Sequence, residues 1–187
     1  MPTTSHHPTT LEILHLFRER GNSLYGGEAV TQLEHALQAA FFAERENATP
    51  ELISAALLHD VGHLLHSLPD TAPDEGIDDR HESLAAGWLS GRFAPAVAAP
   101  VAMHVAAKRY LCAVNPDYLG QLSGPSIQSL QLQGGPMTAD EIAQFESRPH
   151  FQDAVRLRQW DDAAKVVGMS TPDLEHFAAY IDEVCKN

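Results

Sequence analysis

The stretch LLHDVGHLLH, residues 57–66, places one aspartate and three histidines inside an apolar run. A buried imidazole or carboxylate costs free energy unless a partner compensates for its lost hydration. These polar groups therefore either face solvent or converge on a shared partner. A metal ion is the obvious partner for histidine and aspartate together. The stretch thus predicts a core helix with His59 and Asp60 as metal ligands.

Helical periodicity dominates the remainder of the chain, and no strand pattern of convincing length accompanies it. Capping residues and apolar spacing predict helices at 9–20, 28–46, 49–66, 79–91, 95–111, 149–165, a short one after Thr138 and a last one that starts at Thr171-Pro172-Asp173. Residues 67–79 and most of 112–136 are rich in Gly and Pro and are expected to be irregular. The expected fold is all-α, one domain of roughly eight helices over residues 1–187, with a flexible tail at 1–8.

Composition and charge exclude several classes of protein. The formal charge of −13, without a cluster of Lys and Arg, argues against a nucleic-acid partner. No apolar run approaches the roughly 18 residues of a membrane span, and the N-terminus lacks the pattern of a signal peptide. Cys112 and Cys185 are too few for a disulfide framework, which favours the reducing cytoplasm. The sequence leaves the oligomeric state open.

Other predicted helices carry further candidate metal ligands among apolar or small neighbours. They are His35, His81, His104 and Asp161. With His59 and Asp60 they can enclose two metal ions, one carboxylate bridging, and mixed nitrogen and oxygen ligands suit iron or manganese as well as zinc. The alternative for a lone histidine is solvation or a simple hydrogen bond. We favour that alternative for His15, His66, His150 and His176.

The ordered set His35, His59-Asp60 and Asp161, with the HD-x-G-H form of HDVGH, resembles the HD superfamily of metal-binding helical bundles. RHESLAAGWL at 80–89 lacks most of the HHExxDGxGYP signature of the members that hydrolyse cyclic dinucleotides. YGGEAVTQLEHALQAA, HDVGHLL and QWDDAAK instead resemble the HD-domain diiron oxygenases of phosphonate catabolism, the PhnZ-like enzymes. This likeness spans nearly the whole chain.

The resemblance implies a single HD domain with two iron ions, Fe(II) and Fe(III), and O2 as co-substrate. It implies cleavage of the carbon–phosphorus bond of a 1-hydroxyphosphonate, with 2-amino-1-hydroxyethylphosphonate giving glycine and phosphate. A relative takes the N-trimethylated substrate and yields glycine betaine, so the amine end stays open. The implied ligands are His35, His59, Asp60 and Asp161 for one iron, and the bridging Asp60 with His81 and His104 for the other.

Two cations lie at helical spacing from predicted ligands. Lys108 follows His104 by four residues, and Arg158 precedes Asp161 by three. In so acidic a chain, this placement predicts that they neutralise a phosphonate. The alternative is that they pair with neighbouring carboxylates in a solvated network.

Other candidate residues complete the predicted substrate site. His63, one turn beyond His59, is a candidate hydrogen-bond donor, and the resemblance adds Ser126 from the SGPS loop, where serine is otherwise a turn residue. Tyr25 and Glu28 flank two glycines that predict a hinge. The resemblance makes them a gate: Tyr25 fills the open iron position until substrate displaces it, and Glu28 holds Tyr25 and then receives the substrate ammonium. The alternative for Glu28 is a plain helix start.

Two other classes share part of this pattern. An ordinary HD phosphohydrolase needs the H…HD…D set without His81 and His104, and a non-catalytic HD module binds nucleotide or metal as a sensor. The iron content of the protein separates these classes.

Overall fold

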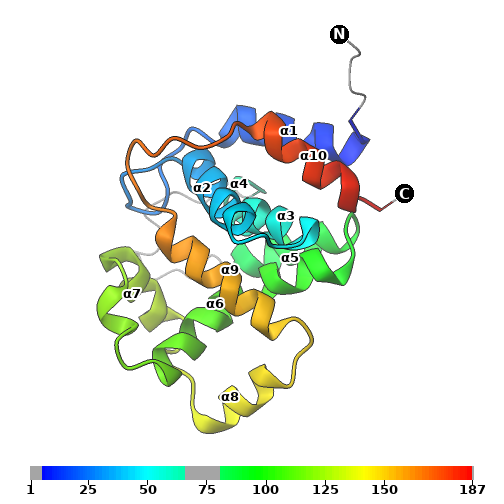
Figure 1. Ribbon diagram of the computed structural model, residues 1–187. Coiled ribbons are helices and arrows are strands. Elements are labelled where there is room, and N and C mark those ends of the chain that lie inside the picture. Colours follow the sequence, from blue (N-terminus) through cyan, green and yellow to red (C-terminus); the bar gives the residue numbers. More distant parts are fainter. Residues whose placement is uncertain (1–5, 66–80, 187) are drawn as a thin grey trace.

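The computed structural model describes residues 6–65 and 81–186, and these form ten α-helices (Figure 1). The helices are α1 (Pro8–Arg20), α2 (Gln32–Arg45), α3 (Pro50–Leu58), α4 (Val61–Leu65), α5 (His81–Ser90), α6 (Pro95–Val114), α7 (Gly124–Leu132), α8 (Ala139–Glu146), α9 (Phe151–Ala163) and α10 (Leu174–Val184). Within these residues, strand-like pairing is limited to two isolated bridges. The predicted all-α class is confirmed, with more helices than the expected eight.

Helix α3 lies at the centre of the fold because it is apolar on every side. Each residue from Leu52 to Leu58 is buried, as expected for a helix without a polar face. Helices α2, α6, α9 and α10 pack around it. In Figure 1, α1 and α10 lie together at one end of the molecule, and α7 and α8 lie at the other. Residues near the C-terminal end of α3 are therefore surrounded by protein.

The helix predicted over 49–66 is in fact two helices separated by a turn at His59 and Asp60. The imidazole Nδ1 of His59 lies 2.8 Å from the carbonyl oxygen of Ala56, the acceptor that the Asp60 N–H would use in a continuous helix. The prediction that His59 and His63 share one helix face is therefore wrong. The break frees Asp60 from the helical arrangement, and His66 lies outside the described residues.

The start of α2 also differs from the prediction. Thr31 and Glu34 form a reciprocal capping box, so the helix begins at Gln32 rather than near residue 28. Glu28 instead closes a tight turn, in which its backbone N–H donates to the carbonyl oxygen of Tyr25 at 2.7 Å. The two intervening glycines have φ values of 40° and 80°. The alternative of a plain helix start at Glu28 is therefore wrong, because this turn precedes the helix.

Segment 112–136 contains helix α7, although its Gly and Pro content predicted irregular structure. The Ser123 side chain caps the helix and Pro125 lies in its first turn, two features that favour helix initiation. Ser126 therefore lies in the first turn of α7 and not in a loop, which corrects the prediction for this residue.

The N-terminal and C-terminal segments of the chain contact each other. Residues 1–5 of the expected flexible tail lie outside the described residues, and α1 begins at Pro8. The His6 ring lies 2.6 Å from the Asp182 carboxylate of α10. The predicted loop at 67–79 also lies outside the described residues. Among the helices of 6–65 and 81–186, none has the length and apolar character that a membrane crossing requires.

Candidate metal centre

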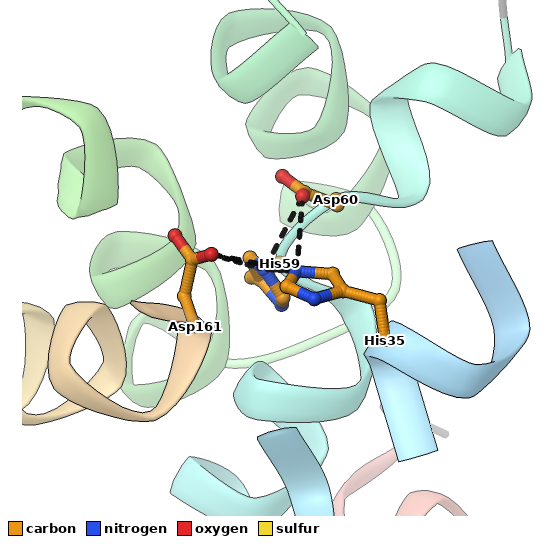
Figure 2. A group of neighbouring side chains, drawn as sticks. All are labelled: His35, His59, Asp60 and Asp161. Atoms are coloured by element: carbon orange, nitrogen blue, oxygen red, sulfur yellow. Dashed lines mark hydrogen bonds and ion pairs between the residues drawn. The ribbon is translucent and has the colours of Figure 1, made fainter. Parts of the chain in front are cut away.

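Four buried side chains from three parts of the fold point at one position. Figure 2 shows His35 from α2, His59 and Asp60 from the turn after α3, and Asp161 from α9 converging there. Oδ2 of Asp60 lies 3.5 Å from Nε2 of His35 and 3.3 Å from Nε2 of His59. Oδ1 of Asp161 lies 3.4 Å from Nε2 of His35. The structure thus brings together the four ligands predicted for the first metal.

The two imidazoles of this group, His35 and His59, face each other through their Nε2 atoms. Nδ1 of His35 lies 2.8 Å from the Ala164 carbonyl oxygen, and Nδ1 of His59 is bonded in the same way to Ala56. A carbonyl only accepts hydrogen bonds, so each Nδ1 carries a proton, and each Nε2 is left to bind a metal ion or a second proton. These Nε2 atoms are only 3.0 Å apart. Such a contact needs a cation between or beside the rings.

A second group shares Asp60 with the first. Oδ1 of Asp60 lies 3.3 Å from Nε2 of His81 and 3.4 Å from Nε2 of His104. The two Nε2 atoms are 3.2 Å apart, and Nδ1 of His104 is 2.7 Å from the Val101 carbonyl oxygen. Each oxygen of Asp60 therefore faces its own pair of histidines. This is the arrangement of a bridging carboxylate.

The distances within both groups fit metal coordination. Ligand atoms about 2.1 Å from one ion are separated by about 3.0 Å at a right angle and about 3.4 Å at the tetrahedral angle. The distances between donor atoms given above fall in or near this range. Both carboxylate oxygens of Asp60 and Oδ1 of Asp161 are buried and accept no hydrogen bond from the residues that the structure describes. Buried charge of this kind requires a positive partner.

The pKa shifts in the first group arise because its histidines and carboxylates lie close together and carry opposite charges. Burial by itself lowers the pKa of His59, but the charges and hydrogen bonds of Asp60 and Asp161 together outweigh it and raise this pKa to about 10. Burial opposes ionisation of Asp60, yet the charge of His59 and the hydrogen bonds of the surrounding histidines together hold the pKa of Asp60 well below its usual range. The group therefore attracts positive charge, which a proton supplies to one histidine and a metal ion supplies to every ligand.

Gly62 allows the two groups to approach each other. A Cβ atom at Gly62 would lie 2.1 Å from the backbone oxygen of His81, far inside van der Waals contact. Glycine thus lets α4 pack directly against the start of α5, which carries His81. The glycine of the HD-x-G-H pattern consequently has a structural role in placing the second ligand group.

Arg158 contacts the ligand Asp161 rather than open space. Its Nη1 donates to Oδ2 of Asp161 at 2.7 Å, leaving Oδ1 to face the histidines. It also donates to both carboxylate oxygens of Asp162 and to the hydroxyl of Tyr118. The alternative of pairing with carboxylates therefore applies to Arg158, although the pairs are buried. Its guanidinium orients a predicted metal ligand, and a direct substrate contact stays a prediction.

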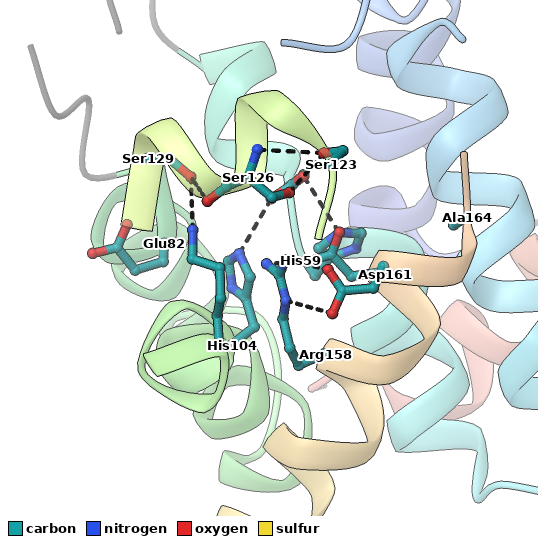
Figure 3. A network of polar contacts seen from close by, with 12 residues as sticks. His59, Glu82, His104, Ser123, Ser126, Ser129, Arg158, Asp161 and Ala164 are labelled. Atoms are coloured by element: carbon teal, nitrogen blue, oxygen red, sulfur yellow. Dashed lines mark hydrogen bonds and ion pairs between the residues drawn. The ribbon is translucent and has the colours of Figure 1, made fainter. Parts of the chain in front are cut away.

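Lys108 lies in a different environment, beside the serines of α7. Its Nζ donates to Oγ of Ser129 at 2.7 Å, and that hydroxyl donates to the backbone oxygen of Ser126 at 3.1 Å. Figure 3 shows Ser123, Ser126 and Ser129 along one face of α7, above Arg158 and Asp161. Burial, and then the positive charge of Arg158, lowers the pKa of Lys108 to about 7.

The predicted gate residues lie at the edge of the first ligand group. The Tyr25 ring stacks on His35 with 3.8 Å between centroids and 12° between planes. His63 meets Tyr25 edge-on at 6.3 Å and stacks on His81 at 4.1 Å, so it lies between the two groups. Burial, and then the negative charges of Asp161 and Asp60, raises the pKa of Tyr25 well above its usual value.

The sequence interpretation missed one cation, Lys165. Its Nζ lies 3.4 Å from Oε1 of Glu28 and 3.0 Å from Oγ of Ser126, so it contacts two predicted substrate-binding residues. The signal was present, because Lys165 follows Asp161 by four residues, the spacing that singled out Lys108 after His104. In the structure α9 ends at Ala163, and Lys165 reaches the site from the segment beyond it.

Comparisons with known proteins place this constellation in a family. No family model matches the chain. Over 171 residues the chain is 48% identical to a hydroxymethylphosphonate dioxygenase of Gimesia maris, covering 91% of this chain and 85% of that protein. Over 169 residues it is 43% identical to a glycine-betaine-forming [1-hydroxy-2-(trimethylamino)ethyl]phosphonate dioxygenase of Leisingera caerulea, covering 90% and 86%. The chain belongs to the hydroxyphosphonate dioxygenases.

The predicted relationship to phosphonate oxygenases is thereby confirmed, and a dioxygenase function agrees with the buried His/Asp groups. An uncharacterized protein of Acanthamoeba polyphaga mimivirus, L432, is 37% identical over 167 residues, covering 88% of this chain and 76% of that protein. The two named dioxygenases differ in the tail of the substrate. Family membership therefore gives the type of enzyme. The tail of the substrate must be argued from the residues of the site.

Proposed function

We propose that this dioxygenase cleaves the carbon–phosphorus bond of a 1-hydroxyphosphonate with O2, and that its substrate is 2-amino-1-hydroxyethylphosphonate. The observation that carries the proposal is Asp60, whose two oxygens face separate histidine pairs in a chain related to hydroxyphosphonate dioxygenases. The products are glycine and phosphate. One O2 balances the atoms, since its two oxygens appear in the new carboxylate and in phosphate.

Two iron ions, Fe(II) and Fe(III), are the proposed cofactors. His35, His59, Asp60 and Asp161 would hold one, and Asp60, His81 and His104 the other. The bound irons supply the activation of O2 that no side chain of this site can provide. The second group offers three protein ligands, and a site with few protein ligands keeps positions open for substrate.

The protein contributes charge and orientation to the bound phosphonate. Lys108 and the hydroxyls on α7 are proposed to bind the phosphonate oxygens, because this charged donor and these neutral donors lie together on one side of the ligand groups. Arg158 is proposed to add charge while it holds Asp161 in position. His63, stacked on His81, is proposed as a further hydrogen-bond donor.

Tyr25 and Glu28 are proposed to respond to substrate as a unit, since one tight turn joins them. Tyr25 would cover the metal centre until substrate arrives, which its stacking on His35 supports. Glu28 would then receive the ammonium of the substrate. The tight turn limits water access to the centre when the ring lies over it.

We expect the iron-loaded protein to consume one O2 per phosphate released from 2-amino-1-hydroxyethylphosphonate. Oxygen electrode traces and phosphate assays on the same samples test this ratio. The panel also contains the N-trimethylated substrate and hydroxymethylphosphonate, the substrates named for the two relatives. Preference for the trimethylated compound would make glycine betaine the product. Phosphate release from a phosphate monoester without O2 uptake would instead identify an HD phosphohydrolase.

A second expected result concerns the pH dependence of phosphonate binding. The pKa of Lys108 is about 7, so its ammonium loses its proton above that pH. Bound phosphonate stabilises the ammonium and raises its pKa, hence binding must take up a proton above pH 7. Relative to Lys108→Met, the affinity of the natural protein for methylphosphonate should fall about tenfold per pH unit above pH 7.

The Lys108→Met variant is the reference because the ligand titrates identically with both proteins. The ratio of the two dissociation constants isolates the contribution of the lysine. It is measured without O2 between pH 6 and 9, about one unit below to about two units above the shifted pKa. A ratio that stays flat over this range would show that Lys108 does not titrate with the bound phosphonate.

A further inference from the structure

We propose that Lys165 is a specificity-determining residue, which is held by Glu28 in the free protein and moves to the phosphonate when a zwitterionic substrate binds. Resting on the proposed function, this inference specifies its substrate class. The substrate ammonium takes the place of the Lys165 ammonium at Glu28. Lys165, released from Glu28, then pairs with the phosphonate.

The contacts of Lys165 place it between the two ends of such a substrate. Oε1 of Glu28 lies 3.4 Å from its Nζ on one side, and Oγ of Ser126 lies 3.0 Å away on the other. Oγ of Ser123 is 3.5 Å away, and the centroid of the Tyr25 ring is 5.8 Å away. Lys165 therefore touches the gate turn and the serine face of α7 at once.

The serine face of α7 connects Lys165 to the proposed phosphonate site. Lys108 donates to Ser129, Ser129 donates to the backbone oxygen of Ser126, and Lys165 donates to the hydroxyl of Ser126. The positive charge of Lys165 also contributes, after burial and Arg158, to the lowered pKa of Lys108. Two lysines thus lie at opposite ends of one short row of serines. A phosphonate dianion placed against this row neutralises both.

The backbone around Lys165 is fixed, so that only its side chain needs to move. The Ala164 carbonyl accepts from the ligand His35. The side-chain amide of Gln38 both accepts from the Val166 N–H, at 3.0 Å, and donates to the Val166 carbonyl, at 2.9 Å. Both α2 side chains are buried. The residues on either side of Lys165 are therefore tied to the helix that carries a metal ligand.

Charge compensation makes the exchange selective. Side chains of Glu28 and Lys165 are only 16% and 13% exposed, and Oε1 of Glu28 accepts no hydrogen bond from the described part of the chain. If Lys165 turned to a phosphonate without a cationic tail, the Glu28 carboxylate would stay buried and unpaired, which is costly. An aminated substrate supplies the missing charge. The pair thus favours zwitterions over hydroxymethylphosphonate.

Binding of two ligands to the iron-loaded protein without O2 tests this inference apart from turnover. The ligands are 2-amino-1-hydroxyethylphosphonate and hydroxymethylphosphonate, measured by calorimetry. Glu28→Gln should weaken the aminated ligand about 10- to 100-fold and strengthen hydroxymethylphosphonate about 3- to 10-fold. Adding Lys165→Met to Glu28→Gln should abolish the gain for hydroxymethylphosphonate, and adding Lys165→Arg instead should keep most of that gain.

Lys186→Met is the matched control, since it removes an exposed lysine that contacts Ser90. It should change neither dissociation constant. Equal weakening of both ligands by Glu28→Gln, or a gain for hydroxymethylphosphonate that persists when Lys165→Met is added, would overturn the exchange. If the predicted binding pattern is found but phosphate is never released, the proposed reaction fails and the exchange stands.

Discussion

Asp60→Asn should remove most of the bound metal and lower phosphate release by more than about 100-fold, since even outer-shell changes at metal sites cost about 10- to 100-fold. The reason is the bridging position of Asp60, whose two oxygens each face a separate pair of histidine Nε2 atoms. An amide keeps the shape of the side chain and loses the charge that both groups need. Elemental analysis should find about two irons per natural chain and less than one in the variant.

Asp117→Asn makes the same chemical change at an exposed position in the connection between α6 and α7. It should retain metal content and turnover, and circular dichroism should show the helical fold in both variants. Full metal content in Asp60→Asn, with turnover within about tenfold of the natural protein, would contradict the bridging assignment.

Gly62→Ala should destabilise the protein by about 3 kcal/mol, at the upper end of the usual cost of overpacking. The new Cβ would lie 2.1 Å from the backbone oxygen of His81, and a backbone atom cannot move aside as a flexible side chain does. The start of α5 must therefore shift, and His81 shifts with it. Thermal unfolding gives the change in stability, while metal analysis should show preferential loss from the second group.

Gly87→Ala is the control for Gly62→Ala. A Cβ at Gly87, within α5, meets nothing within 4 Å. This substitution should be neutral or stabilise the helix by up to about 1 kcal/mol, the difference in helix propensity between Gly and Ala. Equal melting temperatures for Gly62→Ala and the natural protein would show that α4 and α5 do not need their close approach.

The set of candidate ligands was predictable because each of them is an unusual polar residue in an apolar helical pattern. His35, His81 and His104 each interrupt such a pattern, and the structure buries all three or leaves little of them exposed. The all-α class follows from the same periodicity. Capping residues predicted the start of α8 at Thr138 correctly, since a capping box is a purely local structure.

The sequence did not reveal where local hydrogen bonds override helical periodicity. The apolar pattern of 49–66 continues through His59 and Asp60, whereas the structure has a turn at these two residues. Serine capping likewise starts α7 in a segment whose Gly and Pro content indicated a loop. At Ser123 a side-chain cap favours the start of a helix, and periodicity does not report such a contact.

By itself, then, the sequence determined the helical class, the set of candidate metal ligands and the resemblance to phosphonate oxygenases. Only the tertiary structure decided which charges meet. Arg158 and Lys108 look equivalent at helical spacing, yet one is buried against Asp161 and Asp162 and the other against Ser129. Lys165 reaches Glu28 across 137 positions of sequence because α9 ends two residues earlier. Spacing predicts which residues share a helix face, but contacts between elements depend on how the helices pack.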